Sequence, residues 1–369
     1  MSRLTVYLAT TRLMAALVLL FFPIRAWSWG TDGHRIVAKI AADNLSPAAQ
    51  SHVAGILGVT ANQVAYAMET AAVLPDSRFR DEDASTDQWH FINICLQDAR
   101  SDIGRRCHEG NCVTDKIVQY SRRLKDGNFD GWSAAGDLAF LIHFVGDIHQ
   151  PLHAADDADT GGNCINIDSP LRAHNLHDAW DSAIVQGLES RIDSGSPETT
   201  ARKLEEIYAS EKVLDVWNPG HTNDIAWESN LIARADIYAP LHIPIEPCES
   251  NVLCNHKRRV QLDSDYIDRA EVVAGHQLAK AGFRLASLLN ETWVQPINSN
   301  DRLRDANATS ASAVSAKTIS GQIIGDRRSK IYAWPGCGSY DTMAPNNRVI
   351  FPSRDTADQA GYRAAYNCP

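Results

Sequence analysis

Apolar residues recur at helical spacing along most of the chain, from about residue 34 to residue 290. The segments 35–43 and 135–145 both repeat apolar side chains three and four positions apart, as a helix with a buried face does. Ser46-Pro47 marks a further helix start, because proline is favoured at the first helical position. Strand-like alternation is rare. The pattern therefore predicts a mainly α-helical domain.

Pro151 predicts where the helix containing 135–145 ends. A residue that precedes proline is disfavoured in the helical region, so Gln150 should leave the helix. His153 is then expected on a turn beyond the helix end.

The first 28 residues differ from the helical part. They hold Arg3, Arg12 and Arg25, no acidic residue, and an apolar run at 14–22 that is short for a membrane span. Ala26 and Ser28 provide the small residues of a cleavage site. We predict a signal peptide at 1–28, with an uncleaved anchor as the alternative, and a secreted or periplasmic protein without a membrane span. The mature chain would begin at Trp29.

The composition changes again after residue 293. Asn, Ser, Ala and Thr dominate 294–317 without an apolar period, which predicts a linker. A small unit follows at 318–369.

The formal net charge of the whole chain is −10. Removal of the three arginines in 1–28 makes it about −13, which argues against a broad phosphate-binding surface. A local metal centre could still provide a focused positive pocket.

Candidate metal ligands gather between residues 143 and 181. His143 and Asp147 are four residues apart, as are His177 and Asp181, and His153 lies between the two pairs. Residues four apart share one helix face, and zinc accepts imidazole and carboxylate ligands. His143 alone would be read as a core histidine. The chain has 13 histidines, and five of them lie at 143, 149, 153, 174 and 177, which favours a metal site. A free Trp29 amino group and its carbonyl could chelate a metal, with His34 close by.

These residues carry a family resemblance. The chain resembles the zinc-dependent S1/P1 nucleases over roughly 29–293, including the closing helix near 279–286. The matching motifs are Trp29-Gly30…Gly33-His34, Leu74-Pro75-Asp76, Trp89-His90-Phe91-Ile92-Asn93, His143…Asp147…His153, Gly161-Gly162-Asn163 and His177…Asp181. The resemblance implies one helical domain of the S1/P1 nuclease and zinc phospholipase C type.

The resemblance also implies three Zn²⁺ ions per chain and nine ligands. One ion would be held by Asp76, His90, His143 and Asp147; a second by Trp29, His34 and a shared Asp147; the third by His153, His177 and Asp181. Asp147 can bridge because a carboxylate has two oxygens. His149 has no ligand role and is expected to support the ligands.

The implied activity is hydrolysis of single-stranded DNA and RNA to 5′-phosphate products, with 3′-nucleotides as further substrates and a monomer as the active form. Asp76, Asp147 and Asn163 would be catalytic, with Asn163 donating to phosphate. Phe91 would stack on a base and Asn93 would contact it, with a core role as the alternative for Phe91. The family has a basic residue soon after the Asp76 position, but the equivalent residue here is Phe79. Arg78 or Arg80 would then approach phosphate, and we expect Arg78 to bind substrate.

The eight cysteines of an exported chain are expected to form disulfides, and no C-x-x-C motif is present. Cys107 and Cys112 resemble a bridge of the family. Cys248 could pair with Cys254, and Cys337 with Cys368, which would leave Cys95 for Cys164.

Residues 318–369 resemble a small α+β module related to the metal-binding part of the Ada repair protein. That module uses four thiolates and only two cysteines lie here, so we carry over no zinc site. We expect an accessory role such as attachment to substrate or a surface, with a disulfide-stapled tail that binds no ligand as the alternative. Two alternatives to a nuclease remain: a zinc phospholipase C of the same fold, and a non-enzymatic protein that binds surfaces through 318–369. The phospholipase ends its last ligand pair in Glu, whereas this chain has Asp181.

Overall fold

The computed structural model describes residues 29–129, 131–192, 195–209, 221–248, 254, 258–293 and parts of 323–364. Helices dominate 29–293, and strands dominate the described part of 323–364. The predicted mainly α-helical fold with a small strand-containing C-terminal unit is confirmed. The proposed signal peptide 1–28, the linker 294–317 and the proposed pair Cys337–Cys368 lie outside the described residues.

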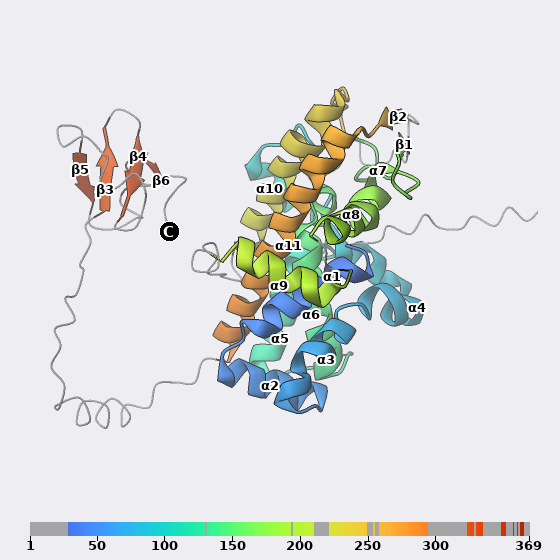
Figure 1. The fold of residues 1–369 in the computed structure, drawn as a ribbon. Helices are drawn as coiled ribbons and strands as arrows, with labels where there is room; N and C mark the ends of the chain where they lie inside the picture. Colours follow the sequence, from blue (N-terminus) through green and yellow to red (C-terminus); the bar gives the residue numbers. More distant parts are fainter. Residues whose placement is uncertain are drawn as a thin grey trace, which may run out of the picture.

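Helix α6 (Ala134–His149) lies at the centre of the helical domain (Figure 1). Every residue from Gly136 to His149 is buried, as expected of a helix that is covered on all sides. Its covering helices are α1 (Thr31–Asp43), α3 (Val64–Ala71), α5 (Val113–Asp126), α10 (Thr222–Ile232) and α11 (Ser264–Thr292). Any polar side chain on the second half of α6 is therefore inside the protein.

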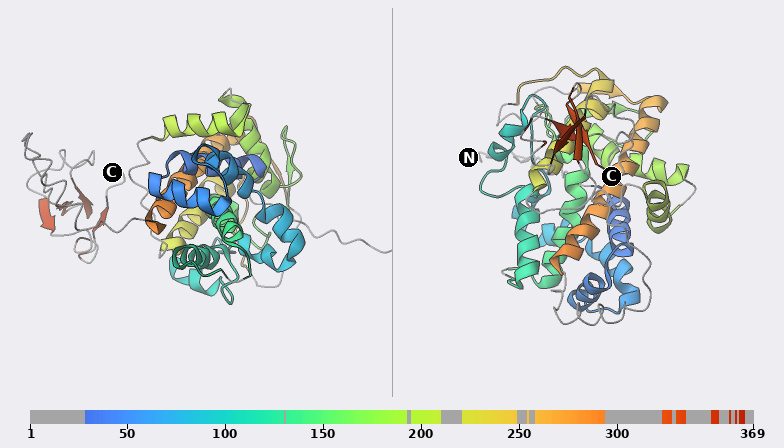
Figure 2. Two further views of the ribbon diagram at one scale, coloured as in Figure 1. Left: turned by 90° about the horizontal axis from the view of Figure 1, so that it is seen from below. Right: turned by 90° about the vertical axis from the view of Figure 1, so that its left-hand side faces the viewer.

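Views from two further directions show the packing of these helices (Figure 2). Helix α11 runs along the length of the domain and packs on α1, α6, α8 and α9. The remaining regular helices are α2 (Pro47–Leu57), α4 (Arg80–Glu82), α7 (Leu176–Asp178), α8 (Ile184–Arg191) and α9 (Pro197–Ile207). Helix α2 begins as predicted: Pro47 is its first residue, and the Ser46 side chain accepts a hydrogen bond from the Ala49 N–H.

Shorter helical turns carry several of the residues of interest. The 3₁₀ turns are η1 (Ala61–Gln63), η3 (Ala84–His90), η4 (Arg100–Arg105), η5 (Pro151–Ala154) and η9 (Ala239–Leu241). Three π turns, η2 (Pro75–Phe79), η6 (Ala179–Ala183) and η8 (Ala233–Tyr238), each lead into or interrupt a regular helix. Such π turns insert one residue per turn and are frequent at functional sites.

The break at Pro151 is confirmed. Helix α6 ends at His149, and Gln150 has the extended φ of −78° and ψ of 114°. The Gln150 side chain then accepts a hydrogen bond from the Leu152 N–H and starts the turn that holds His153.

Strands are few. In the helical domain β1 (Ile165–Asp168) pairs in parallel with β2 (Arg258–Gln261). The C-terminal unit has a four-stranded sheet in the order β5 (Arg348–Phe351), β3 (Ile323–Asp326), β4 (Ile331–Ala333), β6 (Arg363–Ala364). Its small core contains Tyr332, Ala357 and Tyr362.

The disulfides correct two of the predicted pairings. Cys107–Cys112 is present as predicted, but Cys248 pairs with Cys95 and Cys254 pairs with Cys164. The predicted pairs Cys248–Cys254 and Cys95–Cys164 are therefore wrong. The fold brings Cys248 and Cys254 to partners on two separate loops, and spacing along the chain cannot reveal such long-range pairings.

No helix in the described ranges combines the length and the apolar character that crossing a bilayer requires.

Candidate metal centre

His143 and Asp147 lie one turn apart on α6 and are both completely buried. Their side chains meet at 3.3 Å between His143 Nε2 and Asp147 Oδ2. Asp76 from η2 and His90 from the end of η3 approach the same point. Asp76 Oδ1 lies 3.5 Å from His143 Nε2 and 3.6 Å from His90 Nδ1. Asp76, His90 and His143 form one possible ion site, here called the Asp76 group.

His34 on α1 reaches the other oxygen of Asp147. Its Nε2 lies 3.4 Å from Asp147 Oδ1, and its ring stacks on that of His143 with 3.8 Å between centroids. A Cβ at Gly146 would lie 2.9 Å from the His34 ring, so glycine is needed there for α1 to approach α6. His34, His143 and Asp147 form a second possible ion site, the His34 group.

Trp29 lies at the start of this arrangement. Its side chain is completely buried, and the next residue donates a hydrogen bond from the Gly30 N–H to the Asp181 carbonyl at 2.7 Å. The start of the domain is thereby held between the His34 group and the segment that carries Asp181.

His153, His177 and Asp181 form the third possible ion site, the His177 group. His177 on α7 and Asp181 on η6 are four residues apart, with 3.3 Å between His177 Nε2 and Asp181 Oδ2. His153 comes from η5, and its Nε2 lies 3.8 Å from Asp181 Oδ1. The imidazole rings of His153 and His177 stack with their centroids 5.1 Å apart.

Backbone carbonyls fix the orientation of three of these histidines. The Nδ1 atoms of His143, His153 and His177 contact the carbonyls of Ala72, His90 and Gly161 at 2.6, 2.9 and 2.6 Å. A carbonyl only accepts, so each Nδ1 must carry the proton, and in a neutral ring the Nε2 lone pair then faces the group. This is the arrangement in which a protein presents imidazole to a metal ion.

His149 does not share this arrangement, as expected from the sequence. Its Nδ1 contacts the Val145 carbonyl at 2.7 Å, and its Nε2 accepts from Arg284 at 2.9 Å. Both nitrogens are engaged, and burial together with Arg284 lowers the pKa of His149 to about 3.

The charges in the groups also suit a cation. Burial and His143 lower the pKa of His34 to about 4, which keeps this imidazole neutral. Burial acts to raise the pKa of Asp147, but the imidazoles of His143, His34 and His90 outweigh it and hold the pKa well below its usual range. Burial, with Asp76 and Asp147 nearby, raises the pKa of Asp181 well above its usual range. A bound cation would reverse the effect on Asp181.

Two supporting residues were not identified from the sequence. Gln150 donates from Nε2 to Asp181 Oδ1 at 2.6 Å, which links the end of α6 to the His177 group. Asp159 accepts hydrogen bonds from the Gly162 N–H and the Tyr238 hydroxyl. Asp159 thereby shapes the loop in which the Gly161 carbonyl orients His177. Gly161 has a φ of 61°, a left-handed backbone conformation that favours glycine. The Gly161-Gly162 pair was the available signal for this loop.

The predicted substrate contacts lie in two places. Phe91 follows His90 directly, is half-buried, and is not part of the buried hydrophobic core. Asn93 is half-buried two residues further on. Asn163 is half-buried on the Gly161–Gly162 loop, where one N–H of its amide donates to the Thr160 carbonyl at 2.9 Å. The other N–H of that amide is the one that remains for a ligand.

Arg78, which was expected from the sequence to bind substrate, lies at the solvent-exposed side of η2. Its side chain is 69% exposed and pairs with Glu82 on the same helical segment at 2.6 Å. Arg80 is buried and contacts Asp76 instead.

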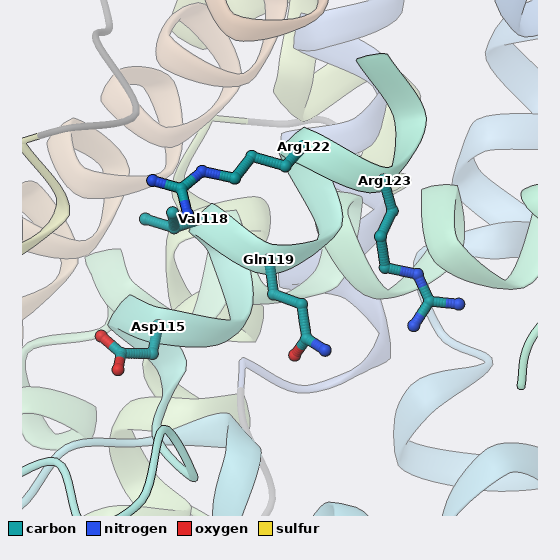
Figure 3. A pocket seen from close by; sticks show the side chains of 5 residues that line it. All are labelled: Asp115, Val118, Gln119, Arg122 and Arg123. Atoms are coloured by element: carbon teal, nitrogen blue, oxygen red, sulfur yellow. The ribbon is translucent and has the colours of Figure 1, made fainter. Parts of the chain in front are cut away.

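A separate hollow runs along one face of α5. Asp115, Val118, Gln119, Arg122 and Arg123 line it, with a volume of about 540 Å³ (Figure 3). Arg122 and Arg123 extend to opposite sides of the helix, and Arg123 pairs with Asp137 at 2.7 Å. None of the predicted site residues lines this hollow, so we assign it no part in the chemistry.

The order and types of these residues agree with a family comparison. The family model for S1/P1 nuclease matches residues 29–293. The chain belongs to the S1/P1 nuclease family. The residues matched by the family model are the same range, 29–293, over which the motifs showed the resemblance.

Relatives with known names point the same way. Nuclease S1 of Aspergillus oryzae is 27% identical over 278 residues, which cover 73% of this chain and 93% of the relative. Nuclease P1 of Penicillium citrinum is 29% identical over 270 residues, which cover 71% of this chain and 97% of the relative. Endonuclease 3 of Arabidopsis thaliana is 30% identical over 290 residues, which cover 73% and 90%. These relatives support a hydrolytic nuclease.

Proposed function

We propose that the protein is a zinc-dependent phosphodiesterase that hydrolyses single-stranded DNA and RNA to products with a 5′-phosphate. The observation that carries the proposal is the set of three neighbouring His/Asp groups around α6 in a member of the S1/P1 family. A single metal-binding group would fit many proteins. Three groups, two of which share His143, fit a reaction that must stabilise several charges on one phosphate.

The donor set fits zinc. Imidazole nitrogen and carboxylate oxygen are its ordinary ligands, and the groups offer no thiolate. We assign Asp76, His90, His143 and Asp147 to one ion. We assign His34, Asp147 and the amino and carbonyl groups of Trp29 to a second. The third is assigned to His153, His177 and Asp181.

The side chains of this chain have distinct tasks in the proposed reaction. Zinc, when bound, supplies a cation that lowers the pKa of water to about 7 and neutralises phosphate charge. Asp147 holds two groups in a fixed relation, because one oxygen faces His34 and the other faces His90 and His143. Asn163 donates from its remaining N–H to a phosphate oxygen.

Phe91 supports a single-stranded substrate. Phe91 follows the ligand His90 in the chain, is half-buried and lies outside the buried core, so we propose that a base stacks on its ring. Stacking contributes about 1–3 kcal/mol per base and tolerates any base. A base inside a duplex cannot offer its face in this way. Asn93 has both a donor and an acceptor for the edge of that base.

Secretion is part of the proposal. The predicted signal peptide would be removed to free the Trp29 amino group. Three disulfides join described residues, and such bonds persist in oxidising compartments, which fits a secreted or periplasmic enzyme. We propose that it acts as a monomer.

One assay series tests the function. The purified protein that starts at Trp29 is given single-stranded DNA, duplex DNA, RNA, 3′-nucleotides and phosphatidylcholine, with zinc and after exhaustive chelation. We expect cleavage of the single strands that depends on zinc and leaves 5′-phosphates. Preferred hydrolysis of phosphatidylcholine would instead identify a phospholipase C. Hydrolysis of none of them, with binding retained by residues 318–369 alone, would favour the non-enzymatic alternative.

A further inference from the structure

Arg78 and Arg80 flank Phe79 just after Asp76, and their side chains point in different directions. Residues 75–79 form a π turn, in which the Phe79 N–H donates to the Leu74 carbonyl five residues back. Residues four apart on a helical segment share a face and residues two apart do not, so Arg80 lies on the side of Asp76 and Arg78 does not. Here Phe79 turns into the core against Trp132 and Phe140, and Arg80 follows on the face of Asp76.

The contacts of Arg80 link two carboxylates. Its Nη2 lies 3.0 Å from Asp76 Oδ1, and its Nε lies 2.8 Å from Asp87 Oδ1. Arg80 is only 7% exposed, whereas Asp87 is 49% exposed on η3. The guanidinium therefore joins Asp76, which is 11% exposed, to an anchor at the surface. Arg78, in contrast, points to solvent and to Glu82.

The oxygen that Arg80 contacts is the one that faces the metal group. Asp76 Oδ1 is also the atom 3.5 Å from His143 and 3.6 Å from His90. Asp76 reaches the group from η2, and the other two residues of the Asp76 group come from η3 and α6. A contact that fixes Asp76 Oδ1 therefore fixes how η2 presents its ligand to the other two elements.

We propose that Arg80, and not Arg78, is the positioning residue of the Asp76 group, which holds the Asp76 carboxylate toward His90 and His143 from its anchor on Asp87. This inference rests on the proposed function, because it treats Asp76 as a metal ligand. Arginine suits the task because its planar guanidinium can engage two carboxylates at once in fixed geometry, whereas lysine is a point charge on a flexible stem.

The test measures zinc binding directly, apart from activity. The full-length mature protein and its variants are equilibrated in a series of zinc buffers, and zinc per chain is measured at each free zinc concentration. Loss of a residue that orients a metal ligand lowers metal affinity about 10- to 100-fold. We expect Arg80→Gln to shift one step of the zinc-binding curve by that factor, Arg80→Lys to shift it less, and Arg78→Gln to leave the curve unchanged.

Two further variants separate positioning from general stability. Arg123→Gln removes a largely buried arginine that also pairs with a buried aspartate, Asp137, but contacts no metal group. It should lower the melting temperature without a change in zinc affinity. Asp87→Asn removes the anchor and leaves both Arg80 and Asp76 in place. It should weaken the same zinc step as Arg80→Gln, and it keeps the test informative if Arg80→Gln does not fold.

The outcomes are distinct. The proposal is overturned if the Arg80→Gln and Asp87→Asn variants bind zinc with wild-type affinity. If Arg80→Gln raises KM while zinc affinity stays unchanged, Arg80 contacts phosphate instead. A shift caused by Arg78→Gln alone would also overturn it. A wild type that binds zinc but cleaves no nucleic acid would refute the proposed nuclease, and the zinc curves would still decide the role of Arg80.

Discussion

Asp147→Asn should destabilise the protein much more in the presence of zinc than in chelator. Asp147 is completely buried and its two oxygens face different histidines, at 3.4 Å from His34 and at 3.0 Å from His90. Asparagine keeps the volume but loses the charge and one of the two acceptor oxygens. Two of the three proposed ions should therefore lose a ligand through one substitution.

The size of the effect follows from binding linkage. A ligand that is present at 100 times its Kd stabilises the folded state by about 2.7 kcal/mol, so the loss of two ions costs about 5 kcal/mol. For a domain of this size 1 kcal/mol corresponds to about 2–4 °C, which gives a fall in Tm of about 10–20 °C in zinc. In excess chelator the fall should be only about 1 kcal/mol, the worth of a typical hydrogen bond, because asparagine keeps the volume and one acceptor oxygen of Asp147.

The assay is thermal unfolding of both proteins in zinc and in chelator, with zinc per chain measured alongside. Asp137→Asn is the matched control, since Asp137 is also a completely buried carboxylate on α6 but belongs to no metal group. Its loss of stability should be the same in zinc and in chelator. An equal fall in Tm for Asp147→Asn under both conditions would refute the reasoning and would make Asp147 a packing residue.

Three other predictions follow from the site and the core. Phe91→Ala should raise KM for single strands by about 5- to 150-fold, from about 1–3 kcal/mol of stacking, with zinc content unchanged; a lower Tm with an unchanged KM would instead show a core role. A chain that starts at Trp29 should bind one more zinc and cleave faster than one with a short N-terminal extension, because only a free amine, with a pKa of about 8, can be a ligand; equal zinc content and equal kcat would refute this. Burial and Glu198 raise the pKa of Glu69 to about 7, so its stabilising protonated form is lost as the pH rises from about 4.5 through 7. Glu69→Gln, measured in chelator, should therefore raise stability by about 1–3 kcal/mol at pH 8 and change little at pH 4, and a gain at pH 4 would contradict the assignment.

The sequence by itself determined what depends on near neighbours in the chain. The helical repeat at 35–43 and 135–145 gave α1 and α6, and Ser46-Pro47 gave the start of α2. Pro151 gave the end of α6 because its effect on Gln150 is steric and local. Cys107–Cys112, five positions apart, was also predicted, because it resembles a bridge of the family.

The types of the site residues were also evident from the sequence, but their grouping was not. The motifs named Asp76, His90 and the two i,i+4 pairs as metal ligands, and the structure brings these residues into neighbouring groups. They assigned Asp147 as the shared ligand. The structure places Asp147 between two groups, and it also places His143 in both the Asp76 group and the His34 group. In His143, His153 and His177, the ring nitrogen that faces the metal group is set by the backbone carbonyls of Ala72, His90 and Gly161. These carbonyls come from other parts of the chain.

Only the tertiary structure decided the features that depend on long-range contacts. Cys248 and Cys254 were assigned to each other because they are close in sequence, but packing brings them to Cys95 and Cys164. The i,i+4 spacing of Asp76 and Arg80 was visible in the sequence, but the second contact of Arg80, with Asp87 on η3, depends on packing. Spacing along the chain determines which residues can share a helix face, whereas packing determines which of those faces meet.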